Sequence, residues 1–326
     1  MLERLFNISW YGKLQWTWLL WPLSLLVLYV TKKKRANFLR NKPEAFNVPV
    51  IVVGNITIGG TGKTPVVQSI VRYLISQGYR PGIVSRGYGG SIQSYPHLIS
   101  DRDTANLVGD EPYMLFQSLK VPVVIDPVRK HAVQRLLSEN VNVVISDDGL
   151  QHYGLHRDYE ICVIDGSRGL GNQQIMPVGP LREAKERLKY VDYKLTSSRE
   201  STDGQFKIQP EVWVNVKTGK ELSLGQLQIQ SNAMAIAGIG NPEKFKQTLN
   251  ELGLQLSYKW FPDHYQYQAE DLDSLPDQII MTEKDAVKVL PFSSENMWYL
   301  RIGAQLPKPL FEDLKTKLVQ WENSHG

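Results

Sequence analysis

The run Gly59-Gly60-Thr61-Gly62-Lys63-Thr64 has the residue types and the spacing that a phosphate-binding loop needs. Glycines let backbone N–H groups face phosphate oxygens, and the start of a following helix adds partial positive charge. Lys63 would then reach the β- and γ-phosphates of a nucleotide, and the Thr64 hydroxyl would bind Mg²⁺. Thr57 stands where the usual G-x-x-x-x-G-K-S/T pattern has its first glycine. The motif predicts a nucleotide site, and a glycine-rich turn without nucleotide is the alternative.

Two aspartates, Asp147 and Asp148, follow the apolar run at positions 143–146. A carboxylate at the end of such a strand can hold Mg²⁺ directly or through water in a nucleotide site. A turn that begins with Asp-Asp-Gly is the alternative. Because the run occurs in the same chain as the phosphate-loop motif, we interpret it as a metal-binding strand end.

Three further motifs carry titratable side chains. Asp110 and Glu111 stand just before Pro112 at the start of a predicted helix, where capping is the ordinary role of an aspartate. His264 lies in a polar, aromatic loop, and a lone histidine is usually structural or solvated. The run Thr282–Asp285 ends an apolar strand and faintly resembles the guanine-reading T-K-x-D of GTPases, with a different spacing. We assign it to the nucleotide site or to lobe structure.

The elements that must position these residues alternate between strand and helix. The apolar run Val48–Val53 predicts a strand buried on both faces, and Lys63–Gln77 predicts a helix that ends at Gly78. This alternation predicts a parallel sheet with helices on both faces and ligands at the carboxyl ends of its strands. Further strands are predicted at Pro81–Ser85, Val121–Asp126, Val141–Ser146 and Tyr159–Asp165, with helices at Pro112–Leu119 and Arg129–Glu139.

A second α/β pattern follows the polar run Ser197–Gln209, which we interpret as a domain junction. We predict three parts: residues 1–35 as a membrane anchor, 36–205 as a P-loop NTPase-like domain and 206–326 as a smaller α/β domain. The site is then expected between two lobes. The second pattern consists of strands at Ala233–Ile239 and Gln278–Thr282 and helices at Pro242–Leu252 and Leu310–Trp321.

Length, composition and charge narrow the class of protein. The 326 residues, 42% of them hydrophobic and 21% charged, indicate a globular α/β chain of about two domains. The single cysteine, Cys162, excludes an internal disulfide bond. Residues 1–42 hold eight Lys/Arg and one acidic residue, which leaves 29 Lys/Arg against 32 Asp/Glu in the rest. Because a nucleic-acid binder spreads its basic residues over a folded face, this distribution indicates a membrane partner instead.

The basic N-terminus contains an apolar segment, Leu14–Val30, without a charged residue. As a helix it would be roughly 25 Å long, slightly shorter than the hydrocarbon core of a bilayer. Four tryptophans lie in or near it, and the cluster Lys32–Arg35 follows, which by the positive-inside rule holds the downstream chain in the cytoplasm. A buried core helix and a cleaved signal peptide are the alternatives. A signal peptide is basic before its apolar stretch, whereas here the basic cluster comes after it. We therefore predict a retained segment that spans the bilayer or lies in one leaflet.

Taken together and in this order, these blocks resemble the tetraacyldisaccharide 4′-kinase family of lipid A biosynthesis. The resemblance covers most of the chain, and the family's phosphate loop also lacks the first glycine. The blocks are GNITIGGTGKTP from Gly54, VSRGYGG from Val84, GDEP from Gly109, PVRKHA from Pro127, DDGLQH from Asp147, PVGPLRE from Pro177, AGIGNPEKF from Ala237, FPDHYQY from Phe261 and TEKDAVK from Thr282.

The resemblance implies a two-lobed kinase on the cytoplasmic face of the bacterial inner membrane, with ATP and Mg²⁺ as cofactors. Such an enzyme moves the γ-phosphate to the 4′-hydroxyl of a tetraacylated glucosamine disaccharide 1-phosphate and forms lipid IVA. The implied catalytic residues are Asp110 as base, His264 as its partner and Lys63. The implied nucleotide-binding residues are Thr57, Gly59, Gly60, Thr61, Gly62, Lys63 and Thr64. The implied metal-site residues are Thr64, Asp147, Asp148 and Glu183, and the implied substrate-binding residues are Arg86, Glu111, Arg129, Gln151 and Arg182.

Within this set, Arg86 and the Arg129-Lys130 pair are our candidates for binding the existing anomeric phosphate of the substrate. Two other classes of protein stay open. A membrane-recruited regulatory or partitioning ATPase would carry a signature lysine in K-G-G-x-G-K-S/T, where this chain has Ile58. A non-enzymatic, membrane-anchored nucleotide-binding module would have no need for acidic residues outside the phosphate loop.

Overall fold

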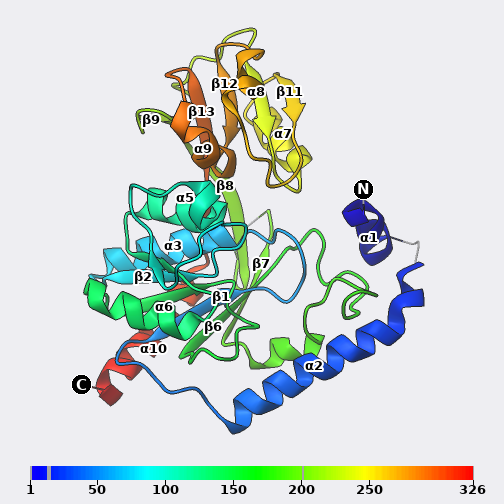
Figure 1. Ribbon diagram of the computed structural model, residues 1–326, viewed down its shortest axis with the longest axis vertical. Helices are drawn as coiled ribbons and strands as arrows, with labels where there is room; N and C mark the ends of the chain where they lie inside the picture. The colour runs from blue at the N-terminus through cyan, green and yellow to red at the C-terminus, as the bar shows by residue number, and fades with distance from the viewer. Residues whose placement is uncertain (1, 13–15, 200–201, 326) are drawn as a thin grey trace.

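The computed structural model describes residues 2–12, 16–199 and 202–325 and consists of two lobes joined by two long antiparallel strands. These strands, β8 (Gln205–Asn215) and β13 (Met297–Gln305), run from one lobe into the other (Figure 1). Strand β8 also pairs with the last strand of the first lobe, so the strand order is continuous: β11-β10-β12-β13-β8-β7-β6-β1-β5-β2-β4-β3. The polar run at positions 197–209 therefore contains the start of a strand, with Phe206 fully buried.

The first lobe is a parallel sheet in which β1 (Val50–Gly54) lies between two parallel neighbours. The parallel pairing of β1 with β5 ends with Val53 opposite Asp147. The loops that follow these two strands therefore leave the sheet side by side. The short edge strand β3 is antiparallel to β4. The other strands of this lobe are β2 (Pro81–Ser85), β3 (His97–Leu98), β4 (Val123–Ile125), β5 (Val143–Asp147), β6 (Tyr159–Ile164) and β7 (Tyr193–Ser197).

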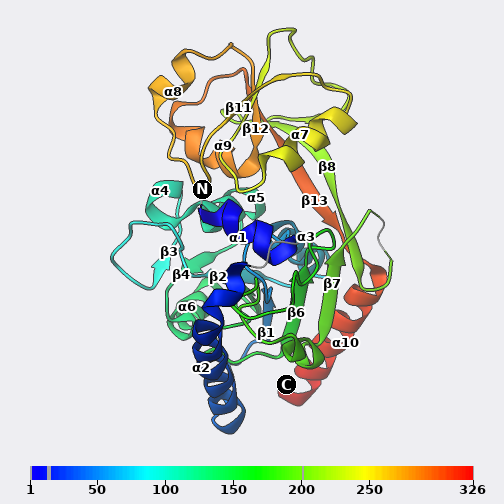
Figure 2. The same ribbon diagram turned by 90° about the vertical axis from the view of Figure 1, so that its right-hand side faces the viewer.

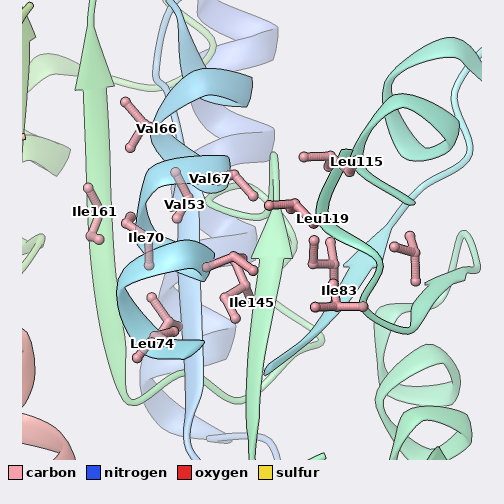
Figure 3. Packing of buried hydrophobic residues seen from close by; sticks show 14 of the residues in the cluster. Val53, Val66, Val67, Ile70, Leu74, Ile83, Leu115, Leu119, Ile145 and Ile161 are labelled. Carbon is pink, nitrogen blue, oxygen red and sulfur yellow. The ribbon is translucent and has the colours of Figure 1, made fainter. Parts of the chain in front are cut away.

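Helices cover both faces of this sheet, as the sequence predicts. In β1, Ile51 and Val53 pack with helix α3 on one face, whereas Val50 and Val52 pack with helix α6 on the other. Figure 3 shows the first of these cores, with side chains of α3 over those of the central strands. The helices of this lobe are α3 (Lys63–Ser76), α4 (Ala105–Val108), α5 (Asp110–Leu119) and α6 (Arg129–Leu136), with short 3-10 turns at Leu137–Glu139 and Lys185–Tyr190.

The last helix, α10 (Lys308–His325), returns to the first lobe. Leu310 and Leu314 are fully buried in the same core as α3, and the ring of Phe311 stacks on that of Tyr73 with centroids 4.2 Å apart. This helix belongs by sequence to residues 206–326, yet it packs on the sheet formed by the earlier residues. The three-part division of the chain stays a prediction.

The second lobe has its own parallel strands and two apolar cores, one on each face. Strands β10 and β12 form its centre, with Ile236 facing one core and Ala235 the other. The second α/β pattern predicted from the sequence is therefore present. Its elements are β9 (Glu221–Ser223), β10 (Met234–Ala237), β11 (Ser257–Trp260) and β12 (Ile279–Thr282), with α7 (Pro242–Glu251), α8 (Ala269–Asp273), α9 (Glu283–Val289) and a 3-10 turn at Leu290–Phe292.

The N-terminal helices lie along the outside of the first lobe (Figures 1 and 2). They are α1 (Leu2–Tyr11), a 3-10 turn (Trp16–Leu20) and α2 (Trp21–Arg40), which has no fully buried residue. The predicted apolar segment includes positions 14 and 15, which lie outside the described residues. Over the described residues, no single helix has the length and apolarity to cross a membrane, although the bent pair formed by residues 5–11 and 16–40 meets those criteria jointly, on length and composition alone.

Candidate active site

The phosphate-loop motif joins the end of β1 to the start of α3. Gly62, the residue before α3, has φ +82, and a Cβ there would lie 2.8 Å from Cδ1 of Ile208. A glycine is therefore needed both for the backbone conformation and for the close approach of β8. A Cβ at Gly60 would meet no atom within 4 Å, so the loop presents open backbone at the N-terminus of a 14-residue helix. Such a terminus attracts anions.

A buried asparagine, Asn55, forms hydrogen bonds that hold this loop in place. Asn55 donates from Nδ2 to the Thr61 hydroxyl at 3.3 Å, and its backbone oxygen accepts from Gln151 Nε2 at 2.9 Å. The loop residues 56–58 also pair with the segment around Pro180: Ile58 N donates to Pro180 O at 2.9 Å, and Thr57 bridges to residue 181. Sequence reasoning missed Asn55, although it lies inside the first motif of the family resemblance.

Lys63 and Arg182 converge on one carboxylate, that of Asp148. Lys63 Nζ lies 3.5 Å from Oδ1, and Arg182 Nη1 donates to both carboxylate oxygens at 3.1 and 3.0 Å. Burial acts to raise the pKa of Asp148, but the two cations outweigh it and lower that pKa. Asp148 has φ +47, a left-handed conformation that aspartate adopts more readily than most residues. The structure thus gathers Lys63, Asp148, Arg182 and Gln151, which is 3.4 Å from Arg182, beside the loop.

Asp147, the last residue of β5, is buried and has a carboxylate oxygen, Oδ1, without a hydrogen-bond partner among the described residues. Burial and the neighbouring charges of Glu111 and Asp148 raise the pKa of Asp147 to about 7. A buried carboxylate oxygen of this kind is costly unless a cation or a hydrogen-bond donor satisfies it. Glu111 follows Asp110 at the start of α5, so the charge that acts on Asp147 comes from the N-terminal end of that helix.

These residues fit a magnesium–nucleotide complex. Within the described ranges, no group of three or more His, Cys, Asp or Glu side chains forms a cage for a metal ion. Mg²⁺ is usually held by one or two carboxylates together with phosphates and water, so Asp147 and the hydroxyl of Thr64 are a sufficient protein contribution. Thr64 is the second residue of α3 and is partly exposed.

Glu183, the fourth predicted metal-site residue, is bonded differently. Its Oε2 accepts from the Tyr153 hydroxyl at 2.7 Å and lies 3.6 Å from Nε of Arg187. Burial raises the pKa of Glu183. Its neighbour Arg182 donates from its backbone N to Ile56 O at 2.7 Å, so the segment lies against the phosphate loop. Tyr153 engages only Oε2 of Glu183, and Oε1 has no hydrogen-bond partner among the described residues.

A second set of basic side chains, Arg129 and His152, follows strands β4 and β5. Arg129 is 2% exposed and donates to the backbone oxygens of Asp126 and Asp147 at 3.0 and 3.2 Å. Burial, against the pull of Asp147, lowers the pKa of Arg129 to about 10. Burial and nearby arginines lower the pKa of His152 to about 4, so its neutral Nε2 accepts from Arg129 N at 3.2 Å.

The other two predicted anion ligands differ from Arg129 in their surroundings. Arg86 is exposed after β2, and its charge acts on both Arg129 and His152. Lys130 instead pairs with Glu44 at 3.2 Å. Arg86 and Arg129 are therefore near each other, whereas the Lys130 ammonium is already bound to a carboxylate.

Asp110 and His264 meet across the two lobes. Asp110 begins α5 after Gly109, which has φ +98 and whose Cβ would lie 2.6 Å from Tyr88 O. His264 lies in the loop after β11 with φ +58, a strained conformation for a non-glycine residue. Its Nδ1 is 3.2 Å from Oδ2 of the buried Asp110. The carboxylate is thus held by a side chain that is 154 positions away in the sequence.

The TEKDAVK block separates into two roles. Asp285 is fully buried and accepts from Gly238 N and from the Tyr267 hydroxyl, both at 3.1 Å, so it holds the second lobe together. Lys284 points instead to His264, with Nζ 3.3 Å from Nε2. Sequence reasoning did not include Lys284 among the site residues, and its only signal was membership of this block.

The sequence comparisons with known proteins agree on one family. A family model described as tetraacyldisaccharide-1-P 4′-kinase (LpxK) matches residues 16–319. A tetraacyldisaccharide 4′-kinase of Aliivibrio fischeri is 41% identical over 329 residues, which cover 98% of this chain and 99% of the relative. A tetraacyldisaccharide 4′-kinase of Vibrio cholerae is 43% identical over 323 residues, which cover 97% of this chain and 95% of the relative.

A solved structure agrees with these sequence matches. The crystal structure of LpxK from Aquifex aeolicus in complex with ATP superposes with a TM-score of 0.79. It is 27% identical and covers 93% of this chain and 98% of that protein. Because the superposition covers nearly the whole of each chain, the two structures are similar in both lobes.

Proposed function

The chain belongs to the tetraacyldisaccharide-1-P 4′-kinase family, and from this premise we propose how its residues divide the reaction. It is an ATP-dependent 4′-kinase of lipid A biosynthesis. The transfer forms a bond between the γ-phosphorus and the sugar 4′-oxygen, breaks the bond from that phosphorus to the β,γ-bridging oxygen, and moves the hydroxyl proton to a base. Bound Mg·ATP supplies the phosphoryl group and a metal charge that stabilises its transfer.

The phosphate loop and Lys63 bind and neutralise the triphosphate. The backbone N–H groups of residues 60–64 and the positive end of α3 surround the β- and γ-phosphates, and Lys63 changes partner from Asp148 to phosphate. Asp147, with its unsatisfied carboxylate oxygen, and Thr64 would hold the Mg²⁺. Arg182 keeps the Asp148 carboxylate ionised and oriented beside them.

Asp110 takes the proton from the sugar hydroxyl, and His264 orients it. The observation that supports this division is the 3.2 Å contact between His264 Nδ1 and Asp110 Oδ2, at the helix end that also brings Glu111 near Asp147. A base needs only modest strength here, because phosphoryl transfer has a loose transition state in which positioning and charge neutralisation dominate. Arg86 and Arg129 would bind the anomeric phosphate of the acceptor, with Glu111 and Gln151 as further substrate-binding residues.

The test of this function is direct. Purified protein is incubated with Mg·ATP and a tetraacylated glucosamine disaccharide 1-phosphate, and the lipid is examined by mass spectrometry. We expect one added phosphate, formed at a rate that depends on the acceptor, and a much slower addition with Lys63→Ala. ATP consumption that is independent of the acceptor would favour the regulatory ATPase instead.

We further propose that the N-terminal helices hold the enzyme on the cytoplasmic face of the inner membrane. Their apolar side chains face solvent: Leu19 is 83% exposed and Tyr29 62%. The basic cluster Lys32–Arg35 on α2 would attract anionic lipid. The remaining large exposed side chains of these helices are Leu5, Ile8, Trp18, Trp21, Leu23, Leu25, Leu26, Val30 and Leu39.

This segment is also attached to the site. The hydroxyl of Ser24 donates to Ile175 O at 2.9 Å and accepts from Val178 N at 3.1 Å. The strip that follows, residues 180–182, pairs with the phosphate loop at Ile56 and Ile58. Membrane contact of α2 would therefore bring the phosphate loop close to the surface at which a lipid-borne hydroxyl is presented.

Flotation with vesicles that contain phosphatidylglycerol tests the membrane proposal. The double variant Leu19→Asp/Leu26→Asp should lose most vesicle binding, since charged side chains resist insertion. Val319→Asp, at an exposed apolar position on α10, is the matched control and should float like the wild type. Equal flotation of the double variant and the wild type would contradict the proposal.

A further inference from the structure

The lysine at the second position of α9 lies against the histidine of the candidate site. Lys284 Nζ is 3.3 Å from Nε2 of His264 and 3.6 Å from Oδ1 of Asp263. Its side chain is 18% exposed, less than half the 41% of the histidine. Lys284 is therefore held between the ring and a carboxylate instead of extending into solvent.

The two partners of the imidazole define which of its nitrogens carries hydrogen. A carboxylate only accepts hydrogen bonds, so Nδ1 of His264 carries the hydrogen that is donated to Asp110. An ammonium only donates, so Nε2 is bare and accepts from Lys284. Asp263 does not compete for Nε2, because its Oδ1 is 4.0 Å away. In this arrangement Nδ1 is the donor to Asp110 and Nε2 is the acceptor from Lys284.

The remaining surroundings of the ring hold it in this orientation. The His264 backbone N donates to Asp263 Oδ1 at 3.0 Å, which fixes the turn at its left-handed φ. The ring meets Tyr88 edge-on, with centroids 6.1 Å apart and planes at 71°. The charged groups that face the ring are thus Asp110 from α5, Lys284 from α9 and Asp263 from its own loop.

We propose that Lys284 is a positioning residue for the transfer reaction, whose ammonium keeps Nε2 of His264 unprotonated and so keeps Asp110 able to accept the hydroxyl proton. A second proton on the ring would place two positive charges 3.3 Å apart, which Coulomb repulsion disfavours. A doubly protonated ring would also form an ion pair with Asp110 and make that carboxylate a weaker base. This inference rests on the proposed roles of Asp110 and His264.

Three variants separate the charge of Lys284 from its bulk. Lys284→Met removes the ammonium and keeps the apolar stem, Lys284→Arg keeps the charge, and Lys246→Met on α7 is the control for loss of a lysine in the same lobe. Lys284→Gln replaces the methionine variant if that one does not fold. For each, kcat and KM for ATP are measured against pH with the disaccharide acceptor.

We expect Lys284→Met to lose about tenfold more activity at about pH 6 than at about pH 8, because the ring gains its second proton at higher pH when the ammonium is absent. The KM for ATP should not change. Lys284→Arg and Lys246→Met should keep the wild-type profile. An equal loss at every pH would indicate a structural role and overturn the proposal.

A second readout does not depend on activity. The chain has six histidines, so enzyme labelled with ¹⁵N-histidine gives few ring signals, and His264→Gln assigns the one of interest. In the wild type, the His264 Nε2 signal should stay that of a bare nitrogen to lower pH than in Lys284→Met. Identical titrations in the two proteins would overturn the proposal. If the wild type transferred no phosphate, the proposed function would fail, and the NMR comparison would still decide the role of Lys284.

Discussion

The phosphate loop and the Asp110–His264 pair are built in opposite ways. The loop belongs to one strand–loop–helix unit, and the supports named for it, Asn55, Gln151 and the strip near Pro180, all lie in the first lobe. The pair takes one side chain from each lobe, and its histidine is 41% exposed and strained. Asp147 links the two regions: it pairs with Val53 at the end of β1, and the charge of Glu111, the residue after Asp110, helps to raise its pKa.

This difference in construction suggests that the two regions have different roles in the reaction. In the proposed mechanism, the first region binds phosphate with groups from one lobe, so it should act whether or not the lobes are correctly placed. The second exists only while the lobes are held together, so its contribution depends on the interface between α9 and the helices of the first lobe. The predictions that follow test this contrast.

The largest effect is expected at the phosphate loop. Lys63→Ala removes the only side-chain charge of the loop and should lower kcat/KM by on the order of 10³-fold or more. The measurement is steady-state transfer of phosphate to the disaccharide, with thermal unfolding as the control for folding. A loss of less than about tenfold would mean that the backbone amides alone provide the binding.

A smaller loss is expected at the bridging pair. Asp110→Asn and His264→Ala should each lower kcat, the first by on the order of 10²-fold, with KM changed less. If the two side chains work as one unit, the double variant should be no worse than the worse single variant. Strictly additive losses in this cycle would show that the two act independently.

The smallest effect on turnover is expected at the interface. Glu283 of α9 is buried, accepts from Gln68 of α3 at 3.4 Å, and has its pKa raised to about 7 by burial, with Arg301 opposing. The folded state therefore binds a proton more tightly than the unfolded chain, and stability falls as pH rises from the ordinary glutamate value to about 7.

Glu283→Gln removes this dependence. At about pH 8 the variant should be more stable than the wild type by on the order of 2 kcal/mol, and at about pH 4 the two should match. Chemical unfolding at both pH values gives the comparison. A variant that is less stable at the higher pH would show that the ionised carboxylate stabilises the interface, contrary to this account.

The same contrast explains what the sequence could predict. The strand–loop–helix unit follows from local pattern: the apolar run before Gly54, the glycines, and the helical spacing of Val66, Ile70 and Leu74. The parallel sheet and the second α/β lobe follow from the same periodicities. These are short-range signals, and a single chain contains them in full.

Other features depend on the placement of distant segments. The return of α10 to the first lobe and the strand that begins inside the polar run need long-range pairing, which periodicity does not encode. Asp110 and His264 came together only through the family resemblance, since 154 residues separate them. No feature of the sequence singled out Lys284. Its role depends on its contact with His264, which in turn contacts Asp110 of α5.

The central claim is that these two regions serve one reaction, with the γ-phosphate held between Lys63 and Asp110. A crystal structure with Mg²⁺ and a non-hydrolysable ATP analogue tests it most directly. We expect the triphosphate on the backbone of residues 60–64, the metal beside Asp147 and Thr64, and the γ-phosphate facing the Asp110 carboxylate. A nucleotide bound elsewhere, or one whose γ-phosphate faces away from the Asp110–His264 pair, would contradict the account.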